Sequence, residues 1–461
     1  MLILAAAVAV SLFLATVARP AVGAYAFLLL SPLVAGIARG ELLPAVRPNE
    51  LLLLLVAAAL LCRMVLLMLQ GRPLRAPVSR IDVLLILLAT AASVLPLALL
   101  HARGQPVTAD DLFYALVLWK YYLLYRIIRA AADTPRAVAT CCRLVLLSAC
   151  VTATVGILQV ADLFGVAGFL HRHYDQPFEG HTGILTERAT STVGSAFGFA
   201  DVMIMSFALA VILLVRGRER PLVALPAAGL CLAGGIAAGS FSGYIGLAVA
   251  MAALSILTGR ALRLLLPMAA AALVFAAALW PVVSGRLAGF SRSDGVPHSW
   301  TGRWENLQRF FLPELTSGFN WLLGVRPAPR LPATESWRDW IYIESGYVWL
   351  LWIGGLPLLA AFIAFALGAG SSLWATARAR NDSVGAAAAA GFVALCVITV
   401  LMLFDPHLTV RGAADLFFPL LALAMADAQG ASRKAIRRES WPGALAPAAG
   451  TFQRRPYRES G

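Results

Sequence analysis

The sequence predicts an all-α fold: a polytopic transmembrane helical bundle of about 12–13 helices. Hydrophobic residues make up 60% of the 461 residues and charged residues only 13%, whereas about a quarter of a soluble domain is charged. Apolar runs of about 20 residues, long enough to cross a bilayer, recur along the chain. Arginine gathers in every second connection between these runs, as expected for loops on the cytoplasmic side of a membrane.

Thirteen apolar runs qualify as spans. The first two are short and form either two spans or one hairpin. The first run has no basic n-region and no clear cleavage site, so we interpret it as a retained helix rather than a signal peptide. The runs lie near residues 1–18, 21–37, 50–69, 82–100, 112–130, 141–161, 196–215, 221–238, 243–258, 262–283, 344–369, 384–404 and 412–428.

Arginine content predicts the orientation. Basic connections near residues 72–80, 129–143 and 216–220 alternate with arginine-poor ones at 101–111 and 239–242. The basic side is predicted to be cytoplasmic, so both long polar loops emerge on the outer face. The predicted units are the N-terminal helices 1–161, a first outer loop 162–195, central helices 196–283, a large, partly helical outer loop 284–343, C-terminal helices 344–428, and a basic, disordered cytoplasmic tail 429–461.

Composition also argues against several classes of protein. The formal charge of +13 lies in short loops beside apolar runs, which indicates a membrane rather than nucleic acid. The six cysteines fall within or at the ends of apolar runs, so neither a disulfide framework nor a zinc motif is predicted. A metal site is not expected either, because one histidine-rich loop segment lacks the required helical spacing; its polar residues are His171, His173, Asp175, Glu179 and His181.

The second outer loop is the longest stretch that cannot sit in a bilayer. Seven of the 11 tryptophans fall between Trp300 and Trp352, and seven arginines fall between Arg286 and Arg338. An aromatic belt at the membrane surface explains part of this enrichment. The surplus is also typical of a sugar-binding surface, because flat rings pack against apolar sugar faces.

A surface helix is predicted within this loop, with Arg303 near its start. Trp304, Leu307, Phe310 and Phe311 recur at helical spacing, as in an amphipathic helix lying on a membrane. Arg303 is then expected either to meet lipid phosphates or to hold a diphosphate, since a guanidinium group grips phosphate oxygens in two places.

Glu344 and Arg188 stand where the two outer loops re-enter the membrane. Glu344 precedes an apolar run and is either a carboxylate favoured by the helix dipole or a general base at the mouth of a cavity. Arg188 precedes a Ser/Thr/Gly-rich link to the next helix and is either interfacial or part of an anion site with the helix start. The predicted topology puts both on the same face as Arg303.

Three other carboxylates have structural explanations. Asp110 and Asp111 follow Thr108 at a helix start, which indicates helix capping. Asp201 is the clearest charge inside an apolar run, and we expect it to be tied to a neighbouring helix.

These features resemble the O-antigen ligase and Wzy-type polysaccharide polymerase superfamily of bacterial membrane glycosyltransferases. The resemblance covers roughly residues 180–420. One customary arginine is missing at Ser240-Phe241-Ser242-Gly243, and the spacing from Arg188 to Gly194 is long. The matching elements are Arg188 with Gly194 and Phe197-Gly198-Phe199, then Thr301-Gly302-Arg303-Trp304, Leu322-Leu323-Gly324-Val325, Glu344-Ser345-Gly346-Tyr347 and Ile353-Gly354-Gly355-Leu356.

The resemblance implies a GT-C-like, metal-independent enzyme without cofactors in the bacterial inner membrane. It would polymerise or ligate undecaprenyl-diphosphate-linked oligosaccharides on the periplasmic face. Its expected partners are the lipid-linked donor, a glycan acceptor, and polysaccharide export or chain-length proteins. Arg188 and Arg303 would stabilise the leaving diphosphate, and Glu344 would accept the proton of the acceptor hydroxyl. Trp304 and Tyr347 would bind substrate. Polymerase is favoured because a ligase more often has His where this chain has Glu344.

Two other classes of function stay open from the sequence. A transporter or flippase of lipid-linked sugars would place ionisable residues near the midplane of several helices, whereas most charges here lie at helix ends. A scaffold of an export complex would not depend on the loop arginines.

Overall fold

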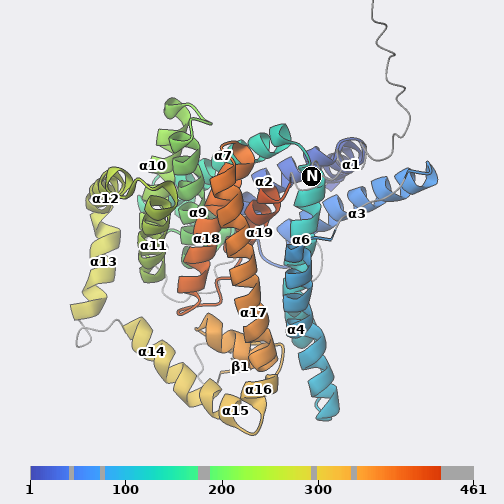
Figure 1. The fold of residues 1–461 in the computed structure, drawn as a ribbon. Coiled ribbons are helices and arrows are strands. Elements are labelled where there is room, and N and C mark those ends of the chain that lie inside the picture. Colours follow the sequence, from blue (N-terminus) through green and yellow to red (C-terminus); the bar gives the residue numbers. More distant parts are fainter. Residues whose placement is uncertain are drawn as a thin grey trace, which may run out of the picture.

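The computed structural model describes residues 2–40, 46–72, 78–174, 187–291, 298–333 and 340–426. The tail at 429–461 lies outside the described residues. Almost every element is helical, and one short antiparallel hairpin is present (Figure 1). The elements are α1 (Leu2–Ala18), α2 (Pro20–Val34), α3 (Pro48–Leu69), α4 (Arg80–Ala102), α5 (Ala109–Ala115), α6 (Val117–Ala131), α7 (Pro135–Val160), α8 (Val166–His173), η1 (Ser191–Val193), α9 (Ala196–Val215), α10 (Pro221–Ala237), α11 (Phe241–Thr258), α12 (Ala261–Ala278), α13 (Trp280–Ser291), α14 (His298–Asn306), η2 (Leu307–Phe311), α15 (Leu312–Thr316), α16 (Asn320–Leu323), β1 (Arg330–Pro332), β2 (Trp340–Tyr342), α17 (Gly346–Ala379), α18 (Ser383–Leu401) and α19 (Ala413–Ala424).

The all-α class and the membrane character are confirmed. Among the described residues, 7 helices are long and apolar enough to cross a membrane, or 8 if the pair α12 and α13, bent by 85°, counts as one span. The seven are α3, α4, α7, α9, α11, α17 and α18. Four further predicted runs correspond to the shorter apolar helices α1, α2, α10 and α19. If these four helices and the bent pair also cross, the described residues hold 12 spans, the lower figure of the expected 12–13.

The predicted run at 112–130 needs a correction. The chain forms two helices there, because α5 ends at Ala115 and α6 begins at Val117, and neither is among the candidate spans. Two arginines of α6 bind the carboxylate of Asp82 at the start of α4: the distances are 2.8 Å from Arg126 and 2.6 Å from Arg129. The face of α6 that carries these two arginines therefore contacts the start of α4 rather than lipid.

Helix α9 lies at the centre of the bundle. Nearly all its residues are buried, and it packs against α7, α10, α11, α18 and α19 (Figure 1). Helix α18 is also largely buried and carries five consecutive alanines and a glycine in Ala386–Gly391. Small residues allow helix backbones to approach closely, which is how membrane helices associate without a hydrophobic driving force.

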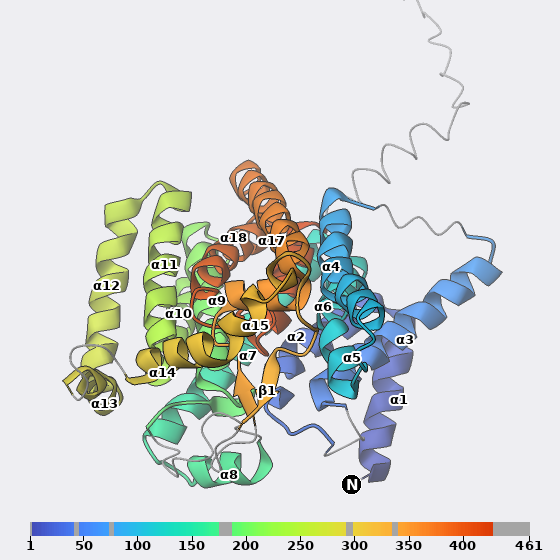
Figure 2. The ribbon, with the colours of Figure 1, turned by 90° about the horizontal axis from the view of Figure 1, so that it is seen from below.

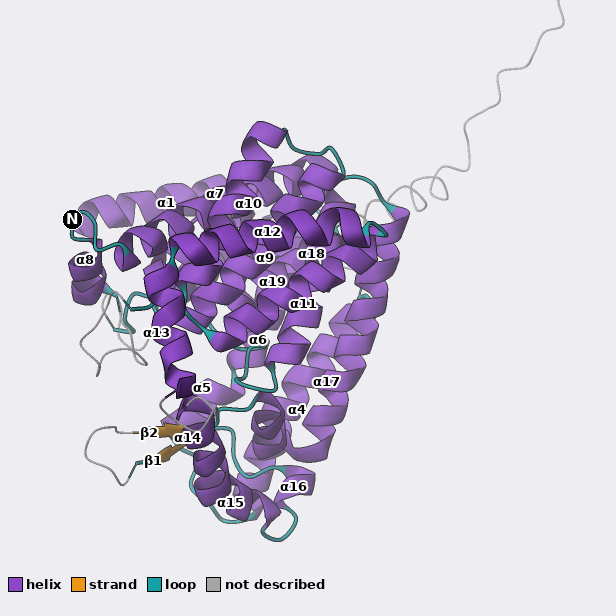
Figure 3. Ribbon diagram, turned by 90° about the vertical axis from the view of Figure 1, so that its left-hand side faces the viewer, coloured by secondary structure: helices purple, strands orange, loops and turns teal. Residues whose placement is uncertain are grey.

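The predicted basic side and the large loop lie at opposite ends of the bundle. At one end, Arg216 donates hydrogen bonds of 2.7 Å to the carbonyls of Arg380 and Ala377, so the basic connections after α9 and α17 meet. The loop helices α14 to α16 and the hairpin lie at the other end, below the bundle in Figure 1 and beside one another in Figure 3. Viewed from that end, α14 and α15 lie in front of the bundle (Figure 2). Which end faces the periplasm stays a prediction.

Two glycines, one in a turn of the large loop and one at a kink in α17, allow the loop to pack closely against α17. The turn after α16 contains Gly324 (φ 91°), and α17 is kinked at Gly355 (φ 60°, ψ −154°). A side chain on Gly324 would overlap the carbonyl of Ile353, and one on Gly355 would overlap the carbonyl of Leu322. The Val325 N–H donates to the Trp352 carbonyl at 2.6 Å. Two of the sequence elements quoted above, Leu322–Val325 and Ile353–Leu356, are thus packed face to face.

Candidate functional site

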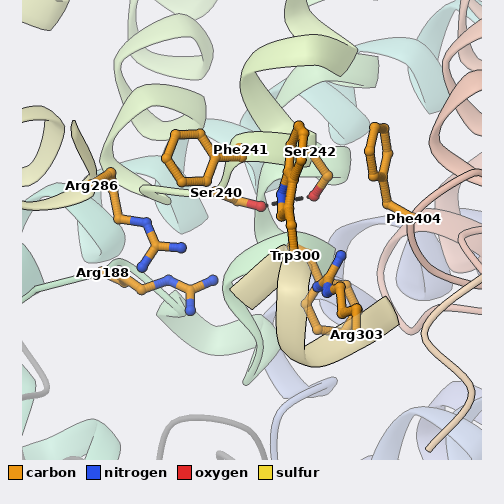
Figure 4. A pocket seen from close by; sticks show the side chains of 9 residues that line it. Arg188, Ser240, Phe241, Ser242, Arg286, Trp300, Arg303 and Phe404 are labelled. Atoms are coloured by element: carbon orange, nitrogen blue, oxygen red, sulfur yellow. Dashed lines mark hydrogen bonds between the residues drawn. The ribbon is translucent and has the colours of Figure 1, made fainter. Parts of the chain in front are cut away.

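A pocket opens at the end of the bundle that carries the large loop. It encloses about 450 Å³ of space, part of it open to solvent. The described residues of its lining are cations, hydroxyls and aromatic rings, with no carboxylate among them, so the lining favours an anionic ligand with an apolar or sugar-like portion. The lining residues are Arg188, Phe197, Ser240, Phe241, Ser242, Arg286, Trp300, Arg303 and Phe404 (Figure 4).

Arg188 reaches this pocket from the link before α9, which Gln159 of α7 holds in place. The buried Gln159 Oε1 accepts hydrogen bonds from the backbone N–H groups of Thr190 (3.0 Å) and Ser191 (2.9 Å). The N–H of Ala189 donates to the Ala237 carbonyl at 2.9 Å. These bonds fix the backbone on the C-terminal side of Arg188.

Arg286 enters beside Arg188 and was not singled out from the sequence. In Figure 4 the two guanidinium groups lie together on one side of the pocket, and Arg303 lies on the other side of Trp300. Arg286 belongs to α13, a helix that turns away from α12 by 85°. The predicted loop from residue 284 is therefore helical at its start. Helix α13 brings Arg286 to the same pocket as Ser240 and Ser242 at the start of α11, the position at which the predicted resemblance lacks an arginine.

The start of α11 forms the wall next to Arg286. Ser240 caps the helix by accepting from the Gly243 N–H at 3.4 Å, and its hydroxyl shares a hydrogen bond of 2.8 Å with that of Ser242. The guanidinium carbon of Arg286 lies 5.3 Å from the ring centroid of Phe241. The positive end of the α11 dipole adds to the attraction that the arginines exert on an anion.

Arg303 joins the pocket to two carboxylates. Its Nη2 lies 3.0 Å from Asp405 Oδ2, and its Nε lies 3.7 Å from Glu344 Oε1. Asn306, one turn later in α14, donates to Glu344 Oε2 at 3.5 Å. Glu344 does not open α17, whose N-cap is Ser345; it lies in the extended link before that cap. The structure therefore brings Arg188 and Arg303 into one pocket and sets Glu344 beside Arg303.

Behind Asp405 lies a buried acid–imidazole pair. His407 Nδ1 is 2.6 Å from Asp201 Oδ2, and both side chains are 1% exposed. Burial opposes protonation of His407, but the Asp201 carboxylate outweighs this effect and raises the pKa of His407 above its usual value. We expected Asp201 to be tied to a neighbouring helix; its partner His407 lies instead on the loop between α18 and α19.

Trp304 and Tyr347, the other two predicted substrate-binding residues, are not part of the pocket lining. The Trp304 side chain is 56% exposed on α14. The Tyr347 hydroxyl donates to the Thr399 carbonyl of α18 at 2.8 Å. Trp300 takes the aromatic role inside the pocket, with its ring centroid 5.6 Å from that of Phe404 and 6.3 Å from that of Phe241.

A pair of carboxylates outside the pocket holds the segment that leads to Glu344. Asp111 caps α5 with Thr108 as predicted, and it also accepts from Arg326 Nε at 3.0 Å and Nη2 at 2.6 Å. Asp110 accepts from Arg330 Nε at 2.9 Å, at the first residue of β1. We call the Asp111–Arg326 and Asp110–Arg330 ion pairs the clasp. Because β1 pairs with β2, which ends at Tyr342, the clasp positions the link that carries Glu344.

The sequence reasoning missed Arg286, Trp300, Asp405 and His407. A signal existed for the last two, because Asp405-Pro406-His407 is a polar turn in an arginine-poor connection. Nothing local marked Arg286 among the loop arginines. Among the described residues, no three His, Cys, Asp or Glu side chains gather as a metal site requires; Asp175, Glu179 and His181 lie outside the described residues.

Comparison with known proteins gives no match: no family model, no curated protein and no solved structure matches this chain. The resemblance to O-antigen ligases and polysaccharide polymerases therefore stays a prediction, carried by the residues quoted above.

Proposed function

We propose that this protein is a membrane glycosyltransferase that polymerises or ligates undecaprenyl-diphosphate-linked oligosaccharides on the periplasmic face of a bacterial inner membrane. The main support is the convergence of Arg188, Arg286 and Arg303 on the lining of one pocket, together with hydroxyls and aromatic rings. Three guanidinium groups at the end of a helical bundle suit a diphosphate whose lipid chain stays in the bilayer. The arrangement of the four aromatic rings suits a neighbouring sugar.

The proposed reaction assigns one role to each group. The acceptor hydroxyl oxygen attacks the anomeric carbon of the donor sugar while the bond from that carbon to the diphosphate breaks. The hydroxyl proton passes to the carboxylate of Glu344, and the lipid diphosphate leaves with the bonding electron pair. The arginines stabilise the charge that develops on the diphosphate. In-line attack inverts the configuration at the anomeric carbon, and no other proton donor is required.

The surroundings of Glu344 support this role. It stands 3.7 Å from Arg303, which faces the pocket, and its side chain is 32% exposed. A carboxylate that retains contact with solvent and lies beside the diphosphate-binding cation can reach an acceptor that approaches from outside the bundle. The presence of Glu rather than His here favours polymerase over ligase.

The experiment that tests the proposal is glycan transfer by purified full-length protein from a lipid-linked donor, in the presence of a chelator. Arg303→Ala is expected to lower turnover about 10²- to 10³-fold, and Glu344→Gln about 10²- to 10⁴-fold with donor binding retained. The matched controls are Arg309→Ala and Glu314→Gln, which alter exposed side chains of the same loop. Unchanged turnover in either site variant rejects that residue's role, and strict dependence on a divalent ion rejects the metal-independent mechanism.

The alternative function is a transporter or flippase of lipid-linked sugars. The observation that favours it is the buried Asp201–His407 pair, since buried titratable pairs serve proton-coupled transport in membrane proteins. The same purified protein distinguishes the two functions. A transporter moves the lipid-linked sugar across the membrane of sealed vesicles and forms no glycosidic bond in detergent. The proposed enzyme forms the glycosidic bond in detergent, without vesicles.

A further inference from the structure

Arg303 differs from the other two arginines of the pocket by its closeness to Asp405. The Arg303 side chain is 25% exposed and that of Asp405 is 10% exposed, and their ion pair measures 3.0 Å. The pair with Glu344 is longer, at 3.7 Å. Among the described residues, Asp405 is thus the nearest counter-charge of Arg303, although it does not line the pocket itself.

Asp405 sits on a backbone that the fold holds firmly. Its carbonyl accepts from the His407 N–H at 2.7 Å, and its N–H donates to the Leu401 carbonyl at 3.2 Å. The side chain of His407 is anchored in turn to Asp201 of the central helix α9. The start of α17 closes the other side, because the Gly346 N–H donates to the Met402 carbonyl at 2.7 Å.

Arg303 is the more adaptable member of the ion pair. It projects from α14, which lies across the end of the bundle (Figure 2), and the neighbouring Gly302 has open space where a side chain would be. A long arginine side chain can change rotamer without backbone movement. A ligand that enters the pocket would therefore draw Arg303 away from Asp405, while Asp405 stays in place.

We propose that Asp405, held by the buried Asp201–His407 pair, is an internal competitor for Arg303 that makes the pocket selective for a diphosphate over the phosphodiester groups of bilayer lipids. The identity of the selected anion rests on the proposed function. A phosphodiester carries one negative charge, as the Asp405 carboxylate does, so it does not attract Arg303 more strongly than Asp405. A diphosphate carries more charge and also engages Arg188 and Arg286, so it displaces the carboxylate. Asp405 acts through Arg303 and is a positioning residue.

The test measures how fast phenylglyoxal modifies Arg303 in purified full-length protein, with the modified peptides quantified by mass spectrometry. Without ligand, Asp405→Asn is expected to raise the rate at Arg303 about five- to tenfold, the range for a half-buried ion pair. His407→Gln is expected to raise it less, because it only loosens Asp405. Glu219→Gln removes a carboxylate that pairs with Arg143 at the opposite end of the bundle and is expected to leave the rate unchanged. The rate at Arg103 reports any general loosening of the fold.

Selectivity is read from protection of Arg303 by inorganic pyrophosphate and by the phosphodiester glycerophosphoglycerol. In the wild type, pyrophosphate is expected to protect Arg303 at a far lower concentration than glycerophosphoglycerol does. In Asp405→Asn, the ratio of the phosphodiester concentration to the pyrophosphate concentration that gives equal protection should fall about five- to tenfold. An unchanged ligand-free rate at Arg303 in Asp405→Asn, or an unchanged ratio, overturns the proposal. If pyrophosphate protects none of the three arginines in the wild type, the diphosphate pocket of the proposed function fails, while the ligand-free rates still decide whether Asp405 restrains Arg303.

Discussion

Removing the carboxylate of Asp111 tests whether the clasp stabilises the large loop. The Asp111 side chain is fully buried, and it accepts hydrogen bonds from Arg326, from Thr108 and from the Ala328 N–H. Burial alone would raise its pKa, but these hydrogen bonds outweigh burial and lower the pKa from 3.8 to about 2. Asp111→Asn keeps the shape of the side chain and removes the charge.

The magnitude follows from the pKa. The difference between 3.8 and about 2 corresponds to about 2 kcal/mol of folding free energy. Since the folded-state pKa is depressed, this stabilisation is fully present above about pH 4 and is lost as the pH falls towards about 2. In detergent at pH 7, Asp111→Asn is expected to lower the thermal midpoint by roughly 2–4 °C. The difference from the wild type should shrink steadily below pH 4.

Asp110→Asn is the matched control. Asp110 also binds an arginine, Arg330, but its side chain is 33% exposed, and ion pairs of that kind contribute about 0–1 kcal/mol. A midpoint for Asp111→Asn equal to that of Asp110→Asn, or a difference from the wild type that persists unchanged at pH 2, would refute the reasoning. In a double-mutant cycle, Arg326→Gln should cost much less in the Asp111→Asn background than in the wild type.

Three other outcomes are expected. Gly355→Ala should destabilise the protein by about 1–3 kcal/mol or prevent folding, because its φ is +60° and the Leu322 carbonyl occupies the space; in thermal melts Gly370→Ala of the same helix, whose nearest neighbour atom is at 3.5 Å, should match the wild type. Gln159→Met leaves two buried N–H groups without their acceptor and should cost about 1–3 kcal/mol per group; equal stability would contradict this role. In titrations with pyrophosphate, Arg286→Ala should weaken binding about tenfold or more and Arg286→Lys less; unchanged affinity would remove Arg286 from the anion site.

Two of the sequence elements that carry the family resemblance show what a local pattern can and cannot predict. The sequence marks Leu322–Val325 and Ile353–Leu356 as unusual because each has glycine beside leucine or isoleucine. It does not reveal that Gly324 lies against the carbonyl of Ile353, or that Gly355 lies against the carbonyl of Leu322. That relation needs the kink in α17 and the return of the loop through α16, and both depend on contacts between segments about 30 residues apart.

The sequence by itself determined the class of this protein, because apolar run length and arginine distribution are local properties that respond directly to the bilayer. It also singled out Arg188, Arg303 and Glu344 as charges at helix entrances. Only the tertiary structure decided their partners: Arg286 beside Arg188, Asp405 against Arg303, and His407 behind Asp405. The physical reason is that a charge near a membrane is stabilised by whichever opposite charge the packing of distant helices brings within a few ångströms, and no spacing along the chain encodes that distance.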